Sequence, residues 1–108
     1  MANQIDIDVV FTALANGTRR RVLEDLRGGP CSVSDLAEPH DMALPSFLQH
    51  LRVLEKAGLV HSEKHGRTRT VEACRAPMLR LETWLDRQRV TWEHRLNQFD
   101  DFVTQEND

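Results

Sequence analysis

The segment 32–58 constrains the fold more than any other part of the chain, because residues that end helices divide it. Pro39 cannot donate a helical hydrogen bond and disfavours helical geometry at the preceding residue, so a first helix, capped by Ser32, ends there. Pro45 suits the first turn of a second helix, and Gly58 suits the left-handed residue that ends it. The pattern predicts helices at 33–38 and 44–57, joined by a tight connection.

The second of these helices has two different faces. Phe47, Leu51 and Leu54 recur at helical spacing and predict the buried face. The opposite face carries mostly hydrogen-bonding side chains: Ser46, Gln49, His50, Val53 and Lys56, with Arg52 at its flank. A short helix, a tight connection and a second helix with such a face predict a helix-turn-helix at 32–58, whose second helix is shaped for the major groove of DNA.

Residues 59–72 predict a β-hairpin that follows this motif directly. Strands at 59–64 and 67–72 are joined by a turn at His65-Gly66. The expected tip is basic, with Lys64, His65, Arg67 and Arg69. A hairpin in this position is the wing of a winged helix, and its cations suit the phosphate backbone or the adjacent minor groove.

The residues before the helix-turn-helix predict two short helices. The first covers 5–14, with Ile5, Val9 and Ala13 on one apolar stripe. The second runs from the N-cap Thr18 to about residue 27. A strand of one or two residues at Cys31 then leads into the motif.

Three consecutive arginines, Arg19 to Arg21, invite a phosphate-binding hypothesis. We favour a solvated helix start in which one or two of them pair with Glu24 or Asp25 at helical spacing. Backbone contacts and a salt bridge between subunits are the alternatives.

The last predicted helix, 77–103, is long for a domain of this size. Its apolar residues follow a spacing of three and four, interrupted once at Gln88: Met78, Leu81, Leu85, Trp92, Leu96, Phe99 and Val103, flanked by Trp84 and Phe102. Because a small domain cannot cover such a stripe alone, we predict a two-fold partner packed on 5–14 and 77–103. The expected interface residues are Val9, Leu81, Leu85, Trp92, Leu96 and Phe99. A cofactor pocket lined by the two tryptophans is the less favoured alternative.

Bulk properties fit a single cytoplasmic domain, 1–108. Two cysteines in 108 residues do not make a disulfide scaffold, and no apolar run approaches the ~20 residues that span a bilayer. The net charge of −3 is unevenly distributed, with five Lys/Arg against three Asp/Glu in 40–70 and four against seven in 76–108. The mildly basic middle permits DNA binding without requiring it.

The segments ALANGTRRRVLEDL and SVSDLAEPHDMALPSFLQHLRVLEKAGLV, followed by the wing and the terminal helix, resemble the ArsR/SmtB family of dimeric bacterial winged-helix repressors. The run QHLRVLEKAGLV is the most specific part, and the resemblance covers about residues 5–100. It implies a mainly α fold with a β-hairpin wing, a dimer with a long C-terminal dimerisation helix, and binding to double-stranded operator DNA. The implied DNA-binding residues are Pro45, Ser46, Leu48, Gln49, His50, Arg52, Lys64, Arg67 and Arg69.

Two of these positions have defined chemistry, and one departs from the family pattern. Gln49 can bond bidentately to adenine, and His50 can donate to guanine or to phosphate. Many relatives have a small hydroxyl residue at the position of Leu48 and a serine at the position of Ala43. In this chain the Leu48 side chain could instead meet a thymine methyl group.

The family's recurrent metal ligands are absent, so we expect neither a metal nor a cofactor. Ser32 and Ser34 occupy positions where metal-sensing relatives have cysteines, and hydroxyls are poor ligands for soft metals. The terminal helix has a single histidine, His94. Cys31 and Cys74 leave open a thiol-switched repressor, although free cysteines more often pack as small apolar residues.

The leading prediction is therefore a homodimeric, sequence-specific DNA-binding regulator. The resemblance to the family favours a repressor. The alternative is a winged-helix module for protein–protein contact, which the acidic total charge keeps open. An enzyme is not expected, because the sequence has no nucleophile–base pairing, glycine-rich phosphate loop or HExxH spacing.

Overall fold

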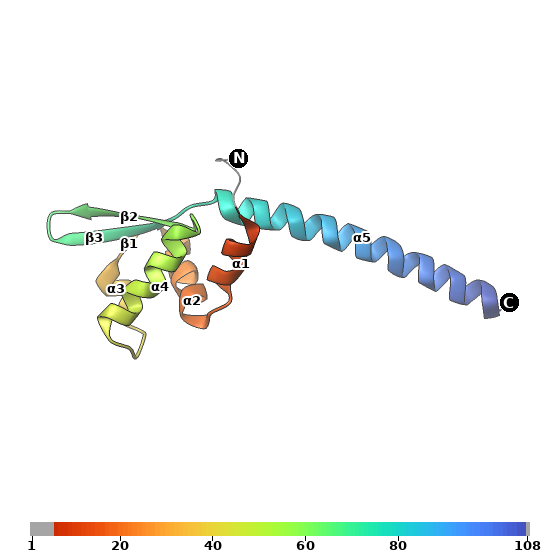
Figure 1. The fold of residues 1–108 in the computed structure, drawn as a ribbon, viewed down its shortest axis with the longest axis horizontal. Coiled ribbons are helices and arrows are strands. Elements are labelled where there is room, and N and C mark those ends of the chain that lie inside the picture. Colours follow the sequence, from red (N-terminus) through yellow and green to blue (C-terminus); the bar gives the residue numbers. More distant parts are fainter. Residues whose placement is uncertain (1–5, 108) are drawn as a thin grey trace.

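The computed structural model describes residues 6–107, and Ile5 of the predicted first helix lies outside them (Figure 1). The elements are α1 (Ile7–Leu14), α2 (Gly17–Asp25), a short 3-10 helix (Leu26–Gly28), β1 (Cys31–Ser32), α3 (Val33–Ala37), α4 (Leu44–Lys56), β2 (Val60–His65), β3 (Thr68–Ala73) and α5 (Ala76–Asn107). The predicted order of helices, helix-turn-helix, wing and long terminal helix is confirmed. None of the described helices is apolar over enough of its length to cross a bilayer.

The two N-terminal helices begin one or two residues from the predicted positions. The Asp6 carboxylate caps α1 by accepting from the backbone N–H of Asp8 at 3.0 Å. The prediction of Thr18 as N-cap was wrong, because the Asn16 side chain takes that role and accepts from the N–H of Arg19 at 3.1 Å. Asparagine is among the strongest N-caps, so the helix begins at the glycine that follows it.

The helix-turn-helix forms as the sequence predicts. The Ser32 hydroxyl caps α3 by accepting from the N–H of Asp35 at 3.1 Å. At the end of α4, Gly58 has φ +76°, and the N–H groups of Gly58 and Leu59 donate to the carbonyls of Glu55 and Leu54. This pair of hydrogen bonds is a Schellman motif, which requires a left-handed residue at Gly58.

Gly58→Ala is expected to destabilise the fold by about 1–2 kcal/mol, because a Cβ disfavours left-handed geometry. The added Cβ would also lie 3.4 Å from the Pro77 side chain at the start of α5. Gly28→Ala is the matched control, since a Cβ there meets nothing within 4 Å and φ is not left-handed. Urea denaturation at one fixed protein concentration measures both changes. Equal losses of stability in the two variants would contradict the role of Gly58 as the left-handed residue that ends α4.

The sheet is three-stranded and antiparallel, in the order β1-β3-β2. Cys31 of β1 pairs with Val71 of β3, so the strand that enters the helix-turn-helix is bound to the wing. The predicted hairpin turn was wrong by one residue: His65 pairs with Thr68, which leaves Gly66 and Arg67 as the turn. Gly66 has φ +63° and no other residue of the turn is left-handed, as a type II′ turn requires.

The core lies where α1, α2, α3 and α4 meet the sheet and the first turns of α5. Its members are Val10, Ala13, Val22, Leu26, Leu36, Phe47, Leu51, Leu54, Ala57, Leu59, Val60, Val71 and Leu81. The predicted inner face of α4 is confirmed, since Phe47 and Leu54 are fully buried and Leu51 nearly so. The core therefore fixes which face of α4 is left at the surface.

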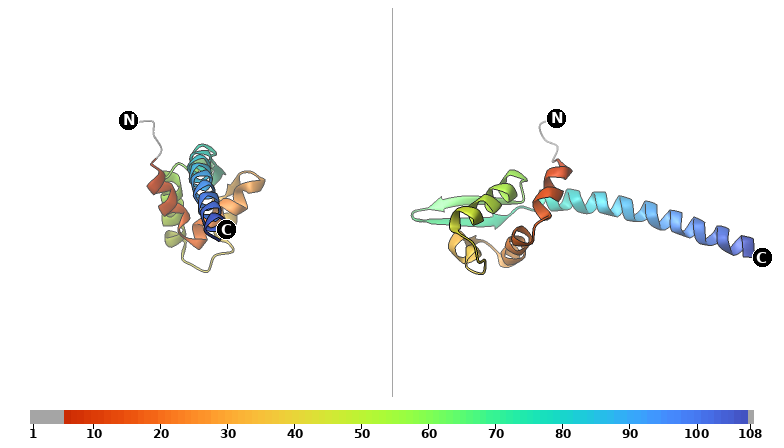
Figure 2. Two further views of the ribbon diagram at one scale, coloured as in Figure 1. Left: turned by 90° about the vertical axis from the view of Figure 1, so that its right-hand side faces the viewer. Right: turned by 60° about the horizontal axis from the view of Figure 1, so that its bottom comes forward.

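Helix α5 leaves this body and projects away from the wing (Figures 1 and 2). It has 32 residues, five more than the ~27 predicted, and is about 48 Å long at 1.5 Å per residue. Pro77 lies in its first turn, as predicted, and is buried. The longest dimension of the molecule, 72 Å, results from this helix.

Candidate nucleic-acid interface

The surface of α4 presents three polar side chains expected at the DNA. Ser46, Gln49 and Arg52 are exposed, and within residues 6–107 their side chains make no intrachain hydrogen bond. Pro45 is exposed beside them in the first turn of the helix. These side chains have donors and acceptors available for base edges or phosphates.

Two apolar residues of the same helix are less available. Leu48 and Val53 are half-buried and pack against the core. Leu48 also lines a hollow between α4 and the hairpin, together with Arg52 and Glu55. Only part of the Leu48 side chain is therefore left for a thymine methyl group.

His50 is half-buried and bound to α2. The Nη1 group of Arg19 lies 3.0 Å from Nδ1 of His50. Burial lowers the pKa of His50 below its ordinary value, and the positive charges of Arg19 and His40 lower it further. These effects favour the neutral form of the imidazole.

The arginine cluster on α2 was only partly predicted. Arg21 pairs with Asp25 at 3.0 Å, as expected from helical spacing. Arg19 and Arg20, however, are not simply solvated, because they donate to carbonyls at the C-terminus of α1: Arg20 to Leu14, and Arg19 to Thr12 and Ala13. Sequence spacing could not reveal these contacts, since they join two helices across a turn.

The three predicted cations of the wing differ in whether they hydrogen-bond to other residues of the described chain. Lys64 and Arg67 are exposed near its tip, and within the described chain neither side chain has a hydrogen-bond partner. Arg69 is exposed as well, but its Nη1 donates to the Ser62 hydroxyl at 3.0 Å. Lys64 and Arg67 are thus the freer of the three for phosphate contacts.

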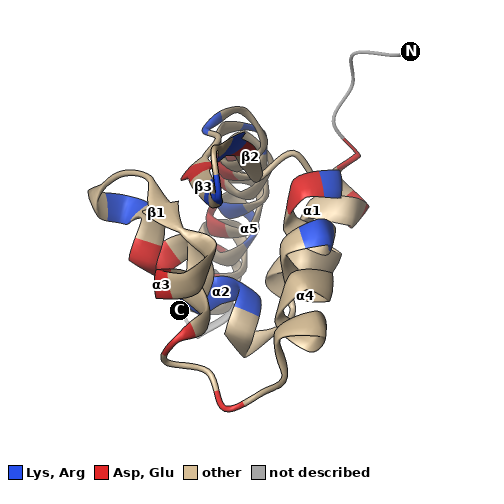
Figure 3. Ribbon diagram, turned by 90° about the vertical axis from the view of Figure 1, so that its left-hand side faces the viewer, with Lys and Arg blue, Asp and Glu red and all other residues tan. Residues whose placement is uncertain are grey.

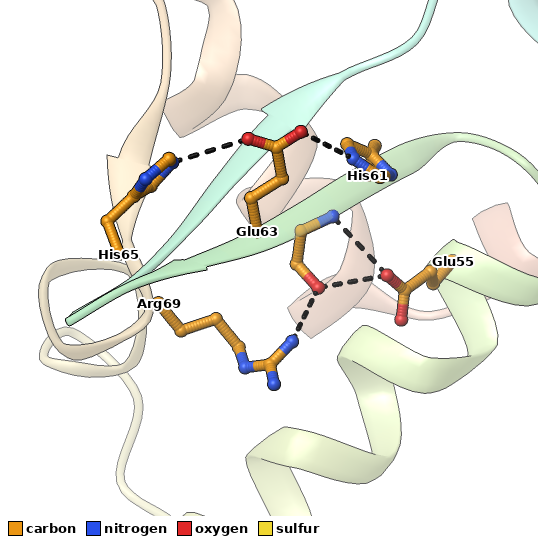
Figure 4. Close-up of polar contacts among 6 residues, drawn as sticks. Glu55, His61, Glu63, His65 and Arg69 are labelled. Atoms are coloured by element: carbon orange, nitrogen blue, oxygen red, sulfur yellow. Dashed lines mark hydrogen bonds and ion pairs between the residues drawn. The ribbon is translucent and has the colours of Figure 1, made fainter. Parts of the chain in front are cut away.

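A polar chain fastens the wing to α4 (Figure 4). Oε1 of Glu55 accepts from both the backbone N–H and the hydroxyl of Ser62, at 3.3 and 2.9 Å, and that hydroxyl in turn accepts from Arg69. Because β2 is an edge strand, these contacts also satisfy one of its outward N–H groups. The residues that form this link were not singled out for it by the sequence analysis.

The other face of β2 carries a second polar group. The carboxylate of Glu63 lies between two histidines, 3.2 Å from Nε2 of His61 and 3.3 Å from Nε2 of His65 (Figure 4). Residues two apart on a strand share a face, which explains the arrangement. All three side chains are more than half exposed, so these contacts stabilise the hairpin little.

Charge is distributed unevenly over this end of the molecule. Basic residues lie among acidic ones on the hairpin, on α2 and on α4, whereas α3 and the loop after it carry acidic residues and no Lys or Arg (Figure 3). The surface formed by α4 and the wing is therefore the one suited to a polyanion, and α3 is not.

The opposite end of the molecule has a large apolar surface. Leu85, Trp92, Leu96 and Phe99 are 47–62% exposed, and Val9 on α1 is 36% exposed. Leu81 differs from the prediction, because it is only 6% exposed and packs in the core of its own chain. Trp84 contacts Phe11 of α1 edge-to-face, with ring centroids 5.6 Å apart, so it packs against α1 of its own chain.

The residues at the family's metal positions do not fit a metal. No group of three or more His, Cys, Asp or Glu within residues 6–107 is placed to hold one. The Ser32 hydroxyl is already used as the cap of α3. Both cysteines are free thiols and half-buried, and burial together with Glu72 raises the pKa of Cys74, which disfavours its reactive thiolate.

Comparisons with known proteins agree in matching this chain to helix-turn-helix transcriptional regulators. Residues 14–63 match a family model described as a helix-turn-helix domain. The chain is 35% identical over 101 residues to the HTH-type transcriptional regulator Rv2034 of Mycobacterium tuberculosis, covering 94% of this chain and 92% of the relative. It is also 35% identical over 57 residues to the transcriptional repressor SdpR of Bacillus subtilis, covering 53% and 63%.

A solved structure extends the match to the fold. The crystal structure of an ArsR family transcriptional regulator superposes with a TM-score of 0.78 at 46% identity, covering 81% of this chain and 90% of that chain. Because the residues before α5 make up less than this share of the chain, the similarity extends beyond the helix-turn-helix into at least part of the terminal helix.

Proposed function

Because the chain belongs to the ArsR/SmtB family of winged helix-turn-helix transcriptional regulators, we propose that it acts as a homodimeric repressor that binds a short imperfect palindrome in operator DNA. In this proposal α4 enters the major groove and the wing follows the phosphate backbone. The regulator would act in the cytoplasm and would catalyse no reaction.

One observation carries the proposal: the exposed polar residues of α4 and the cations of the wing lie at the same end of the molecule, where Arg52 and Arg69 line one hollow between helix and hairpin. Gln49 and Ser46 offer hydrogen-bonding groups for base edges, and Arg52, Lys64 and Arg67 offer charge for phosphates. The link from Glu55 through Ser62 to Arg69 favours movement of the helix and the wing as one unit.

A second copy is proposed to cover the exposed apolar side of α5, joined by Val9 of α1. Two-fold pairing there puts one reading helix on each side of the dimer, as an operator with two half-sites requires. For this architecture the half-site centres are expected about 34–36 Å apart, or one helical turn of DNA.

We propose that no metal regulates this binding. The donor set described above gives no support for a site, and the raised pKa of Cys74 argues against a switch that uses this thiol. A thiol switch that includes Cys31 is a second outcome for the experiment to detect.

Selection of bound sequences from a random duplex pool tests the proposal, using metal-free protein with reduced thiols at two salt concentrations. We expect an imperfect palindrome, with an affinity that falls steeply as salt rises because phosphate contacts release counterions. Adding zinc or an oxidant is expected to leave binding unchanged. Recovery of no sequence at low salt would refute the proposal and favour a protein-interaction module.

A further inference from the structure

A single arginine joins three helices behind the reading surface. Nε of Arg19 on α2 donates to the carbonyl of Ala13 at 2.7 Å, and Nη2 donates to that of Thr12 at 3.1 Å. Both carbonyls belong to the last turns of α1. The remaining group, Nη1, lies 3.0 Å from Nδ1 of His50 on α4.

This contact determines which nitrogen of His50 carries the proton. A guanidinium can donate hydrogen bonds but cannot accept them, so Nδ1 is the acceptor. A neutral imidazole with an unprotonated Nδ1 carries its hydrogen on Nε2. Among the described residues Nε2 of His50 has no partner, and it is not one of the buried unpartnered atoms, so it is open to solvent.

We propose that Arg19 is a positioning residue for DNA recognition, which holds His50 as its Nε2–H tautomer and so presents one directed donor to the operator. The acceptor would be guanine O6 or N7, or a phosphate oxygen. The inference rests on the proposed function, since it requires α4 at the DNA.

The surroundings of His50 keep this donor neutral. Burial lowers the pKa of His50 most, followed by the charge of Arg19 on α2 and by the electrostatic effect of His40 in the loop before α4. Among the described residues, Nε2 of His40 is itself buried without a partner. Acid therefore converts the His50 ring into a cation with two donors less readily than it would a solvent-exposed imidazole.

Nitrogen-15 NMR of the free wild-type protein, labelled at histidine, tests the tautomer without any DNA. We expect His50 to show a protonated Nε2 and an unprotonated Nδ1, and to titrate below its ordinary value of ~6.5. A protonated Nδ1, or titration at or above the ordinary value, would overturn the proposal even if the protein binds its operator.

Operator binding tests the consequence. Arg19→Ala is expected to weaken binding about tenfold, because a donor in each half-site is no longer directed. Arg20→Ala is the matched control, since Arg20 also donates to a carbonyl of α1, at 2.9 Å, but makes no hydrogen bond to α4 within residues 6–107. Equal losses in the two variants would reduce Arg19 to a structural role.

The pH profile separates positioning from loss of fold. In Arg19→Ala, His50 can accept a proton, so affinity should rise from about pH 8 to about pH 6 more steeply than in the double variant Arg19→Ala/His50→Gln. Comparing these two variants cancels the contributions of His61 and His65. Identical profiles would contradict the proposal, whereas failure of the wild type to bind any duplex would refute the proposed function instead.

Operator-binding measurements also identify the group on DNA that accepts a hydrogen bond from Nε2 of His50. His50→Gln is expected to relax the preference at one base pair in each half-site if the acceptor is a guanine. A uniform loss over all sequences assigns the contact to phosphate.

Discussion

Replacing Ser46 and Gln49 together with alanine is expected to lower operator affinity roughly 30-fold or more, with no change in the dimer. One bidentate contact to a base contributes about 1–3 kcal/mol, and a two-fold dimer makes it twice, so the loss is roughly 2–6 kcal/mol. Both side chains are exposed and make no hydrogen bond within the described chain, so their truncation leaves the fold intact. Titration of a fluorescent operator duplex measures the change.

These two residues give a cleaner test than a variant that includes His50, whose ring contacts Arg19. The comparison variant is Lys64→Ala with Arg67→Ala on the wing. It should weaken binding to all sequences alike and reduce the salt dependence, because phosphate contacts carry no sequence information. Undiminished discrimination between operator and random DNA in the Ser46/Gln49 variant would exclude this face of α4 as the reading surface.

Trp92→Glu combined with Phe99→Glu is expected to convert the dimer into a monomer of 12.4 kDa and to weaken operator binding by about 10²–10⁴-fold. The two side chains are 61% and 62% exposed in the single chain, so a charge there does not enter its core. In the proposed interface, however, each carboxylate would be buried without a partner, and two half-sites could no longer be bound together. Sedimentation and operator titration at the same protein concentration measure both effects.

The matched control introduces the same charge on the opposite side of the helix. At 3.6 residues per turn, His94 and Asn97 lie roughly 150° from the centre of the apolar stripe. His94→Glu with Asn97→Glu should therefore leave the dimer and the operator affinity unchanged. Dissociation in the control, or a stable dimer in the Trp92/Phe99 variant, would show that α5 does not form the interface through this face.

Much of this fold follows from residues whose local chemistry allows few alternatives. The helix-turn-helix is predictable from Ser32 as an N-cap, Pro45 in a first turn and Gly58 as a left-handed C-terminal residue, and the structure has all three. In each case the deciding interaction joins residues within five positions of one another. Such local rules also predicted the apolar face of α4, because packing follows helical spacing.

The structure differs from the sequence-based expectations where two local conformations are both favourable, or where interacting residues are distant in sequence. Thr18 and Asn16 are both good N-caps, and only the structure decides between them. A glycine can occupy the first or the second central position of a two-residue hairpin turn, and Gly66 takes the first, so the turn is Gly66-Arg67 and not His65-Gly66. The contact from Arg19 to His50 spans 31 positions and has no sequence signature, so the role proposed for Arg19 in positioning His50 could not be identified from the pattern.

The attachment of the wing has a consequence for how its reach can vary among proteins of this architecture. Ser62 binds Glu55 at the middle of the hairpin, and β2 pairs with β3 along its length. Within residues 6–107, the side chain of the turn residue Arg67 makes no hydrogen bond to another element. Insertions at the turn can therefore lengthen the hairpin without disturbing α4.

Each added pair of residues, one on each strand, moves the tip outward by about 3.4 Å and reverses the side to which the next side chains point. Two pairs restore the original side about 6.8 Å farther out, which is roughly the distance between neighbouring phosphates on one strand of DNA. A change in loop length would thus shift the backbone contact by one nucleotide and leave the sequence preference of the recognition helix intact.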